Sequence, residues 1–185
     1  PTLMHLDLNS CFATIEQQAN PLLRGKPVAV AAYTTPGGCI LAASIEAKRC
    51  GVKTGMRVRD GLSLCPNLRV LLPDPGKYRF VNCQLLALLG EYTAEVEVCS
   101  IDEMVFNLDG TPAIERRWQR GESVTAAMRQ LGEEIKRRIK AEIGDWLTVS
   151  VGFAPNRYLA KTASGLHKPD GLEGITAANI EAVLA

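Results

Sequence analysis

The chain has 185 residues, with 21 Lys and Arg against 20 Asp and Glu, 46% hydrophobic residues and 22% charged residues. This length and balance predict one globular domain, or two small ones, and exclude a disordered tail, a coiled coil and a collagen-like chain. Apolar stretches fall short of the roughly 18 to 20 residues that cross a bilayer, and the N-terminal sequence lacks a cationic segment followed by an apolar run. We therefore expect no membrane contact and a soluble, cytoplasmic protein.

The net charge and the cysteines narrow the choice of binding partners. A net charge of +1 lacks the basic excess of most nucleic-acid-binding domains, so any DNA contact must come from local patches. The six cysteines show neither zinc-site spacing nor a disulfide framework. We expect them to be reduced and mostly buried thiols.

The first half of the chain reads as two groups of elements. Residues 3–8 predict a buried strand that carries Asp7 near its end, and residues 10–18 a helix capped by Asn9 or Ser10. Next along the chain, two strands and a helix are expected at 27–32, 39–43 and 44–49, and we expect these three to form a small separate layer. Residues 69–72 indicate a further strand.

A helix and a hairpin follow. Apolar residues at helical spacing predict a helix over 76–92. Residues 95–99 and 104–108 alternate as half-buried strands on either side of the segment SIDE, which indicates a hairpin with acids at its tip.

The remaining elements complete an α+β pattern. Residues 123–143 predict a helix whose cationic residues are either solvated or in contact with phosphates. A strand, a helix and a short strand follow at 147–154, 156–165 and 172–175. The order favours a ferredoxin-like βαββαβ sheet with an insertion from about residue 19 to residue 77.

Three carboxylates are candidates for a metal site. Asp7, Asp102 and Glu103 converge if their two strands are neighbours in the sheet. Crowded acids repel one another unless a divalent cation offsets their charge, and hard oxygen ligands suit Mg²⁺ or Mn²⁺. Two such ions form the clamp of phosphoryl-transfer enzymes. Acid pairs at hairpin tips are also common without a metal, so spacing alone leaves both readings open.

Six sequence blocks resemble the Y-family DNA polymerases, the translesion enzymes, with polymerase IV-like and polymerase V-like branches. The blocks are HLDLNSCFATIE (5–16), NPLLRGKPVAV (20–30), EAKRCGVKTGM (46–56), KYR (77–79), SIDE (100–103) and SVGFAPNRYLAKTASGLHKPDG (150–171). The resemblance implies a catalytic palm at 1–18 and 78–185 and an inserted small α/β fingers subdomain at 19–77. The thumb and little finger, which follow in the family, are absent from this sequence.

The resemblance also implies roles for individual residues. Asp7, Asp102 and Glu103 correspond to the catalytic metal ligands, together with the backbone carbonyl of Leu8, and would hold two Mg²⁺ ions, with Mn²⁺ as a substitute. Phe12 corresponds to the steric gate that excludes ribonucleotides. The expected nucleotide-binding residues are Asn9, Ser10, Cys11, Phe12, Lys48 and Lys168.

The fingers depart from the commoner family pattern at three positions. Ala42, Ile45 and Lys48 stand where a hydroxyl residue, a Tyr and an Arg usually reach the phosphates. Two phosphate contacts are therefore missing, and Lys48 lacks the planar fork of Arg. The polymerase V-like branch has similar changes at the last two positions. We expect an active enzyme with a high KM for nucleotide.

The resulting hypothesis is a DNA-directed DNA polymerase that joins a dNTP to a primer 3′-hydroxyl on primer–template DNA, with low fidelity and tolerance of damaged templates. This chain would be a trimmed core or a naturally minimal form that binds DNA weakly, and a sliding clamp would bind through the missing C-terminal regions. Two alternatives remain: a non-catalytic polymerase-like scaffold in the DNA damage response, and a two-metal nucleotide cyclase, for which the fingers have no use.

Overall fold

A computed structural model describes residues 2–184, and the chain divides into two compact units. The first unit contains the chain up to Asn9, Asn82–Ile143 and the chain from Thr148 onward. The second contains Ser10–Val81 and Gly144–Leu147. One of the boundaries lies inside a continuous helix, α4 (Pro75–Gly90). No helix within residues 2–184 is long and apolar enough to cross a membrane.

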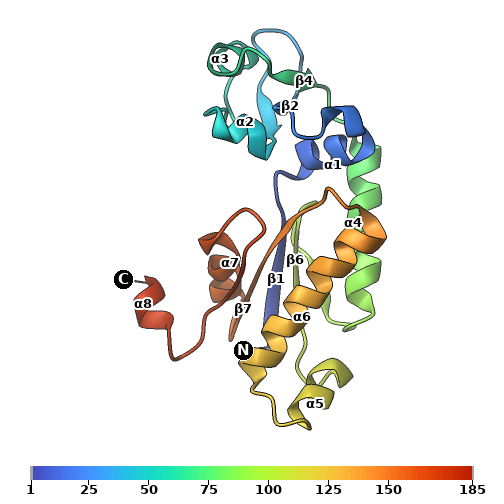
Figure 1. The fold of residues 1–185 in the computed structure, drawn as a ribbon, viewed down its shortest axis with the longest axis vertical. Helices are drawn as coiled ribbons and strands as arrows, with labels where there is room; N and C mark the ends of the chain where they lie inside the picture. The colour runs from blue at the N-terminus through green and yellow to red at the C-terminus, as the bar shows by residue number, and fades with distance from the viewer. Residues whose placement is uncertain (1, 185) are drawn as a thin grey trace. The chain divides into compact units, whose positions relative to one another are not determined.

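The first unit is built on a five-stranded sheet (Figure 1). In spatial order its strands are β5 (Val96–Val98), β6 (Glu103–Asn107), β1 (Leu3–Leu8), β7 (Val149–Ala154) and β8 (Leu172–Gly174). Strand β1 pairs antiparallel with both β6 and β7, and β8 joins β7 in parallel. The first four strands have the order of a ferredoxin-like βαββαβ sheet, and β5 and β6 form the expected hairpin.

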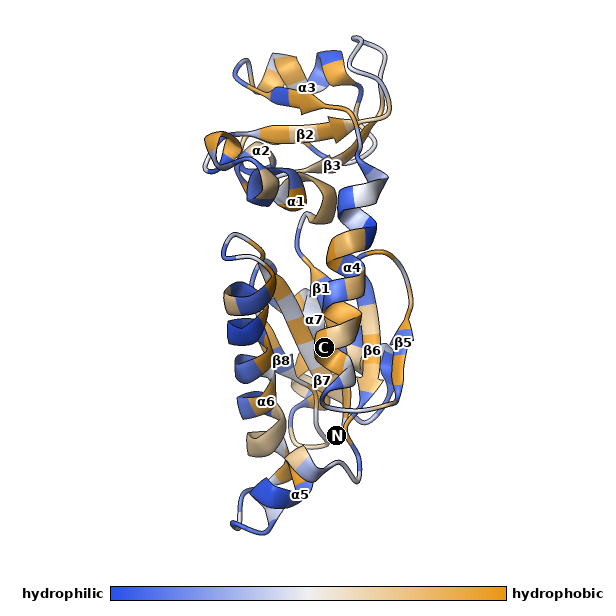
Figure 2. Ribbon diagram, turned by 90° about the vertical axis from the view of Figure 1, so that its right-hand side faces the viewer, coloured by the Kyte–Doolittle hydropathy of each residue, from blue (hydrophilic) through white to orange (hydrophobic). Residues whose placement is uncertain are grey.

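Helices cover both faces of this sheet. Helix α7 (Arg157–Leu166) packs closely on β7, because at Gly152 a Cβ atom would overlap the Ala160 carbonyl. Helix α6 (Val124–Arg138), extended by the π-helical turn η2 (Ile139–Ile143), lies on the other side in Figure 1. Since β1 is covered on both faces, its apolar residues fill both sides and only His5 and Asp7 interrupt them, and Figure 2 shows both apolar and hydrophilic colours on this sheet.

The second unit has its own three-stranded sheet. Its strands are β3 (Ile40–Ala43), β2 (Val28–Ala31) and β4 (Arg69–Leu71), and its helices α1 (Cys11–Ala19), η1 (Pro21–Leu23), α2 (Ile45–Arg49) and α3 (Val58–Leu64). Alternate residues of β2 face two different apolar clusters: Val28 and Val30 meet Ala13 of α1, while Ala29 and Ala31 pack with Ala47 of α2. The expected separate layer is confirmed.

Some short helices were not expected from the sequence. These are η1, α3, α5 (Pro112–Trp118) and α8 (Ile180–Leu184). Helix α3 contains Gly61, which weakens its helical pattern, and the glycine is there because a Cβ atom would lie 2.9 Å from Cδ1 of Ile40. Close packing at this position therefore hid the helix from a reading based on propensity.

The expectation that the cysteines are mostly buried is wrong. All six are free thiols, as expected, but only Cys11 and Cys65 are buried. The other four are exposed because they lie at turns, strand ends or the outer side of a helix. A thiol is therefore buried only where its position faces an apolar core.

Candidate active site

The three candidate carboxylates lie where β1 meets the tip of the β5–β6 hairpin. Asp7 is directly opposite Glu103 in the antiparallel ladder, so the two side chains project from the same face. The next backbone pair along joins Leu8 and Asp102, whose carbonyl accepts the Leu8 N–H at 2.9 Å. Strands β1 and β6 are neighbours in the sheet, as the prediction requires, and this places Asp7 beside Glu103.

Two lysines lie against these carboxylates. Lys161 Nζ is 2.7 and 3.0 Å from the two carboxylate oxygens of Glu103, and Lys168 Nζ forms an ion pair with Asp7. Partial burial raises the pKa of Glu103, but the hydrogen bond and charge of Lys161 outweigh it and leave the pKa below its ordinary value. Asp102 instead accepts a 2.6 Å hydrogen bond from Ser100. Sequence reasoning missed Lys161.

A buried histidine completes the environment of Glu103. His5 is 1% exposed, and its Nδ1 is 2.9 Å from the Ser164 hydroxyl of α7. Its Nε2 faces Glu103 at 3.7 Å and has no hydrogen-bond partner within residues 2–184. Burial lowers the pKa of His5, so the ring is neutral at pH 7. In the sequence His5 is only a histidine within an apolar strand, so nothing there indicates its contact with Glu103.

The donor set fits a hard divalent cation. Asp7, Asp102 and Glu103 supply carboxylate oxygens, and Leu8 brings a backbone carbonyl to the same strand end. Across the described part of the chain, no three His, Cys, Asp or Glu side chains form a ready-made metal cage. Instead, lysine ammonium groups offset the charge of two of the carboxylates. The chemistry therefore favours a cation here, and its binding requires these side chains to rearrange.

The loop that carries Lys168 is held from two sides. Asn9 Oδ1 accepts the backbone N–H of Asp170 at 2.8 Å, while Asn9 Nδ2 donates to Ser150 at 2.9 Å. Lys136 of α6 and Lys140 of η2 lie 3.0 and 3.1 Å from the Asp170 carboxylate. These two cations are therefore used inside the unit, and the loop is fixed near Asp7.

The first residues of α1 belong to the second unit. Ser10 is in the left-handed region, with φ 50°, and precedes the helix, which begins at Cys11. The expected cap residue is correct, but its side chain makes no capping hydrogen bond. Ser10 Oγ is buried without a hydrogen-bond partner among the described residues. Such an orphaned hydroxyl, next to a helix N-terminus, fits a phosphate-bearing ligand.

Phe12 is backed by a second aromatic ring. Its ring stacks on that of Tyr78, with centroids 4.3 Å apart and planes at 11°. The Tyr78 hydroxyl donates to the buried Glu16 at 3.0 Å, and Lys77 Nζ binds the other oxygen of Glu16 at 2.8 Å. Burial raises the pKa of Tyr78. Sequence reasoning quoted Tyr78 within the KYR block but missed its role.

The remaining fingers residues also lie in the second unit. Lys48 is exposed in the last turn of α2, whose first turn is capped by Ser44 through a 3.2 Å bond to the Ala47 N–H. Ala42 packs beside Phe12 in the apolar cluster of α1 and β2. The predicted site residues thus form two groups, one in each unit.

The sequence matches a described protein family. The model of the impB/mucB/samB family covers residues 6–165 of this chain. The DNA polymerase IV of Pseudomonas paraeruginosa is 34% identical over 183 residues, which is 99% of this chain and 49% of that protein. The DNA polymerase IV of Pelotomaculum thermopropionicum is 40% identical over 167 residues, 90% of this chain and 39% of that protein.

Solved structures give the same picture. An insertion ternary complex of Dbh DNA polymerase aligns over 100% of this chain and 51% of its own, with a TM-score of 0.85 and 28% identity. The crystal structure of DinB from Sulfolobus solfataricus also aligns over the whole chain, with a TM-score of 0.82 and 27% identity. The chain spans about half the length of the relatives it matches.

Proposed function

Because the chain belongs to the impB/mucB/samB family and shares the core fold of Y-family DNA polymerases, we propose that it is the palm and fingers of a translesion DNA polymerase. The proposed reaction joins a dNTP to a primer 3′-hydroxyl opposite a template base, with release of pyrophosphate. The observation that carries this proposal is the pairing of Asp7 with Glu103, next to the backbone hydrogen bond between Leu8 and Asp102.

The palm residues have proposed roles in binding and positioning. Asp7, Asp102, Glu103 and the Leu8 carbonyl are the proposed ligands of two Mg²⁺ ions, or of Mn²⁺. Such ions, when bound, neutralise triphosphate charge and activate the primer hydroxyl. Lys168, which is 43% exposed, is free to turn from Asp7 toward a triphosphate once a cation replaces its charge.

The residues around the start of α1, together with Lys48 of the fingers, bind and select the nucleotide in this proposal. The buried Ser10 hydroxyl and the backbone at the start of α1, through Cys11, hold phosphate oxygens. Asn9 fixes the adjoining strand end, and Lys48 adds a cation. The Phe12 ring occupies the space of a ribose 2′-hydroxyl and so excludes ribonucleotides.

Other parts of the proposal concern the whole protein. We assign the palm to 1–18 and 78–185 and the fingers to 19–77, and the short fingers imply low fidelity on damaged templates. Primer–template DNA and dNTPs are the proposed substrates, and a sliding clamp is a further proposed partner. A cytoplasmic location stays a prediction.

The first test is extension of a labelled primer–template by this chain at low salt with Mg²⁺ or Mn²⁺. We expect slow dNTP incorporation that Asp102→Ala reduces by ~10³-fold or more, since charge neutralisation at the phosphates dominates this chemistry. Asp109→Ala removes an exposed acid from the turn after β6 and serves as the matched control. Equal rates for Asp102→Ala and the native chain would contradict the assignment.

An inactive native chain requires a second measurement. Adding a thumb and little finger from a relative supplies the missing grip on DNA, and extension should then appear. If it does not, and Mn²⁺ titration also shows no binding that depends on Asp7 and Glu103, a non-catalytic scaffold is the better description.

A further inference from the structure

A second polar hollow lies in the first unit, away from the carboxylate cluster. It has a volume of about 550 Å³ and is bordered by α5, α6 and the turn that follows α4. This volume falls within the range of small-molecule sites. Its charged lining consists of Arg116, Arg117, Arg120 and Arg138 and the acids Glu91 and Glu134. Positive charge therefore exceeds negative charge in the lining.

Two of the arginines are neutralised by the acids. Arg117 donates to Glu134 at 3.0 Å, and the Tyr92 hydroxyl donates to the other oxygen of Glu134 at 2.8 Å. Arg138 donates to Glu91 at 2.7 Å and stacks over the Tyr92 ring, 5.5 Å from its centroid. These contacts link the residues of one wall of the hollow. Both acids of the lining are thereby paired with Arg117 and Arg138.

The other two arginines keep their charge available. Within residues 2–184, neither Arg116 nor Arg120 has an ion-pair partner, and the one side-chain bond of Arg116 runs from Nε to the Pro112 carbonyl at 2.9 Å. Arg116 lies in α5 and Arg120 in the turn that follows this helix, and both line the hollow. Each guanidinium thus offers N–H donors in the planar fork that matches a phosphate group.

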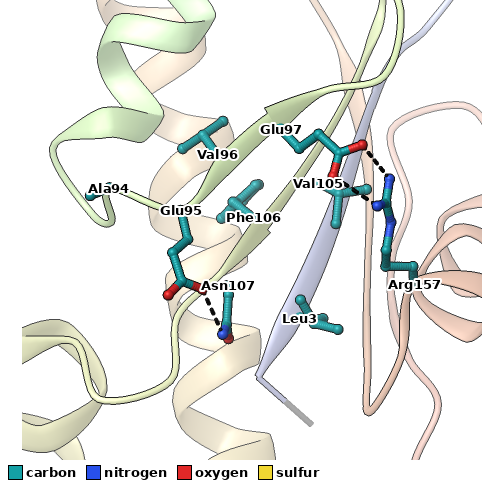
Figure 3. Close-up of a pocket in the computed structure, with 9 residues that line it drawn as sticks. All are labelled: Leu3, Ala94, Glu95, Val96, Glu97, Val105, Phe106, Asn107 and Arg157. Carbon is teal, nitrogen blue, oxygen red and sulfur yellow. Dashed lines mark hydrogen bonds and ion pairs between the residues drawn. The ribbon is translucent and has the colours of Figure 1, made fainter.

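A comparison within the same unit shows that this arrangement is not general. Figure 3 shows a smaller hollow of about 300 Å³ beside β5 and β6, which is lined mainly by apolar groups. The one cation among its lining residues is Arg157, whose two terminal nitrogens each donate to one carboxylate oxygen of Glu97 at 2.7 Å. Glu95 accepts a hydrogen bond from the Asn107 side chain at 2.9 Å. The charged side chains of that hollow pair with other lining residues, whereas the hollow between α5 and α6 has two arginines, Arg116 and Arg120, without an ion-pair partner in residues 2–184.

We propose that the hollow between α5 and α6 binds a phosphate-bearing anion through Arg116 and Arg120. The phosphate comes either from a free nucleotide or diphosphate, or from a nucleic-acid strand that passes over this surface. The wall formed by Tyr92, Glu134 and Arg117 holds the site open and does not itself need to move. The site is separate from the proposed catalytic carboxylates and does not depend on a divalent metal.

The test follows the arginine side chains of this chain by NMR in a buffer with EDTA. Removal of divalent metal prevents phosphate from binding through the carboxylate cluster, so this result is independent of polymerase activity. Pyrophosphate in one arm and a short single-stranded oligonucleotide in another should shift the Nε–H signals of Arg116 and Arg120. Saturation by pyrophosphate assigns a free anion, and saturation by the oligonucleotide alone assigns a strand.

Matched variants decide whether the hollow is the site. Arg116→Gln with Arg120→Gln should weaken binding by ~5-fold or more, because two charge-assisted contacts are lost. Arg69→Gln with Arg137→Gln removes the same charge from exposed positions outside the hollow and should change binding by less than about twofold. Equal weakening by both pairs, absence of shifts, or saturation by an oligoglutamate peptide but by neither phosphate probe would overturn the proposal.

Discussion

The orientation of the Phe12 ring depends on groups outside its own sequence motif. The motif places Phe12 in the first turn of α1, but the ring is fixed by its stack on Tyr78, and Tyr78 is fixed by the buried Glu16. A ring that selects by steric exclusion must be rigid, since a small displacement opens space for another oxygen. In the proposed function, selection against the ribose 2′-hydroxyl therefore depends on all three of these residues.

Replacing Tyr78 should loosen sugar selection. In Tyr78→Leu the Phe12 ring loses its stacking partner, so we expect the ratio of kcat/KM for dNTP over rNTP to fall by ~10-fold, a change of about 1.4 kcal/mol. Phe12→Ala should lower the ratio further. Tyr33→Leu, at an exposed tyrosine of the same unit, is the control. An unchanged ratio in Tyr78→Leu would show that Phe12 needs no support.

Glu134 should make stability depend on pH. Its burial raises the pKa, but hydrogen bonds from Tyr92 and Arg117 outweigh this and leave the pKa below its ordinary value of 4.5. A lowered folded pKa stabilises the fold above the unfolded value, and this stabilisation is lost as pH falls through the folded pKa. In urea titrations from pH 6 to pH 3, Glu134→Gln should therefore flatten the acid side of the profile.

The matched control for that prediction is the neighbouring residue. Glu133 is exposed on the same helix, and no ion pair is recorded for it in the described residues. Glu133→Gln should leave the pH profile unchanged within about 0.5 kcal/mol. If both variants flatten the profile equally, general charge repulsion and not the Glu134 network sets the acid dependence.

At the scale of elements, the contact between β7 and α7 depends on one glycine. Gly152→Ala would push a methyl group into the Ala160 carbonyl and the Ser164 N–H, both of which belong to the helix backbone and cannot turn aside. We expect a loss of ~3 kcal/mol in the free energy of unfolding. Because α7 also carries Lys161, the variant should lower extension activity as well.

At Gly165 of α7, in contrast, a substitution by alanine is expected to raise the stability of the fold. No atom lies within 4 Å of the position that its Cβ would take. Gly165→Ala should therefore stabilise the chain by ~0.5 to 1 kcal/mol through helix propensity. Chemical denaturation of the two variants checks both signs, and destabilisation by Gly165→Ala would show that this face of α7 is not open.

The sequence predicts strands and long helices more fully than it predicts the support of the site. Period-two and helical patterns identify β1, β6, β7 and α6 because each buries a long apolar face. The contacts of Lys161 and Glu16 cannot be predicted in this way, because the sequence pattern does not show which other element a charged side chain binds. Asp7 and Glu103 could be joined only by assuming which strands are neighbours, and the ladder confirms that assumption.

At the scale of the whole molecule, this chain has limited means to hold DNA. Its net charge is +1, it spans about half of its relatives, and Lys136, Lys140 and Arg138 are used in internal ion pairs. Phosphate contacts supply most of the affinity for DNA, so a low net charge and the internal use of these cations imply weak binding. Extension by the isolated chain should therefore be distributive.

Salt dependence measures this grip directly. Anisotropy of a labelled primer–template should show binding that weakens between 50 and 200 mM salt by ~10-fold, which corresponds to about two phosphate contacts. Sodium glutamate in place of chloride is the control for anion effects. A loss of 10³-fold or more would mean that many more phosphate contacts are made than the available cations imply.

The central position of β1 has a consequence for synthesis of the protein. Leu6 pairs with Met104 on one side and Val151 on the other, so β1 leaves the ribosome before either partner strand and has to wait for both. Until then, an apolar strand with two unpaired edges stays open to the chaperones and the other chains around the nascent polypeptide. Ser10–Val81 emerges in between, so its sheet is complete while the strand that bears Asp7 still has no neighbour.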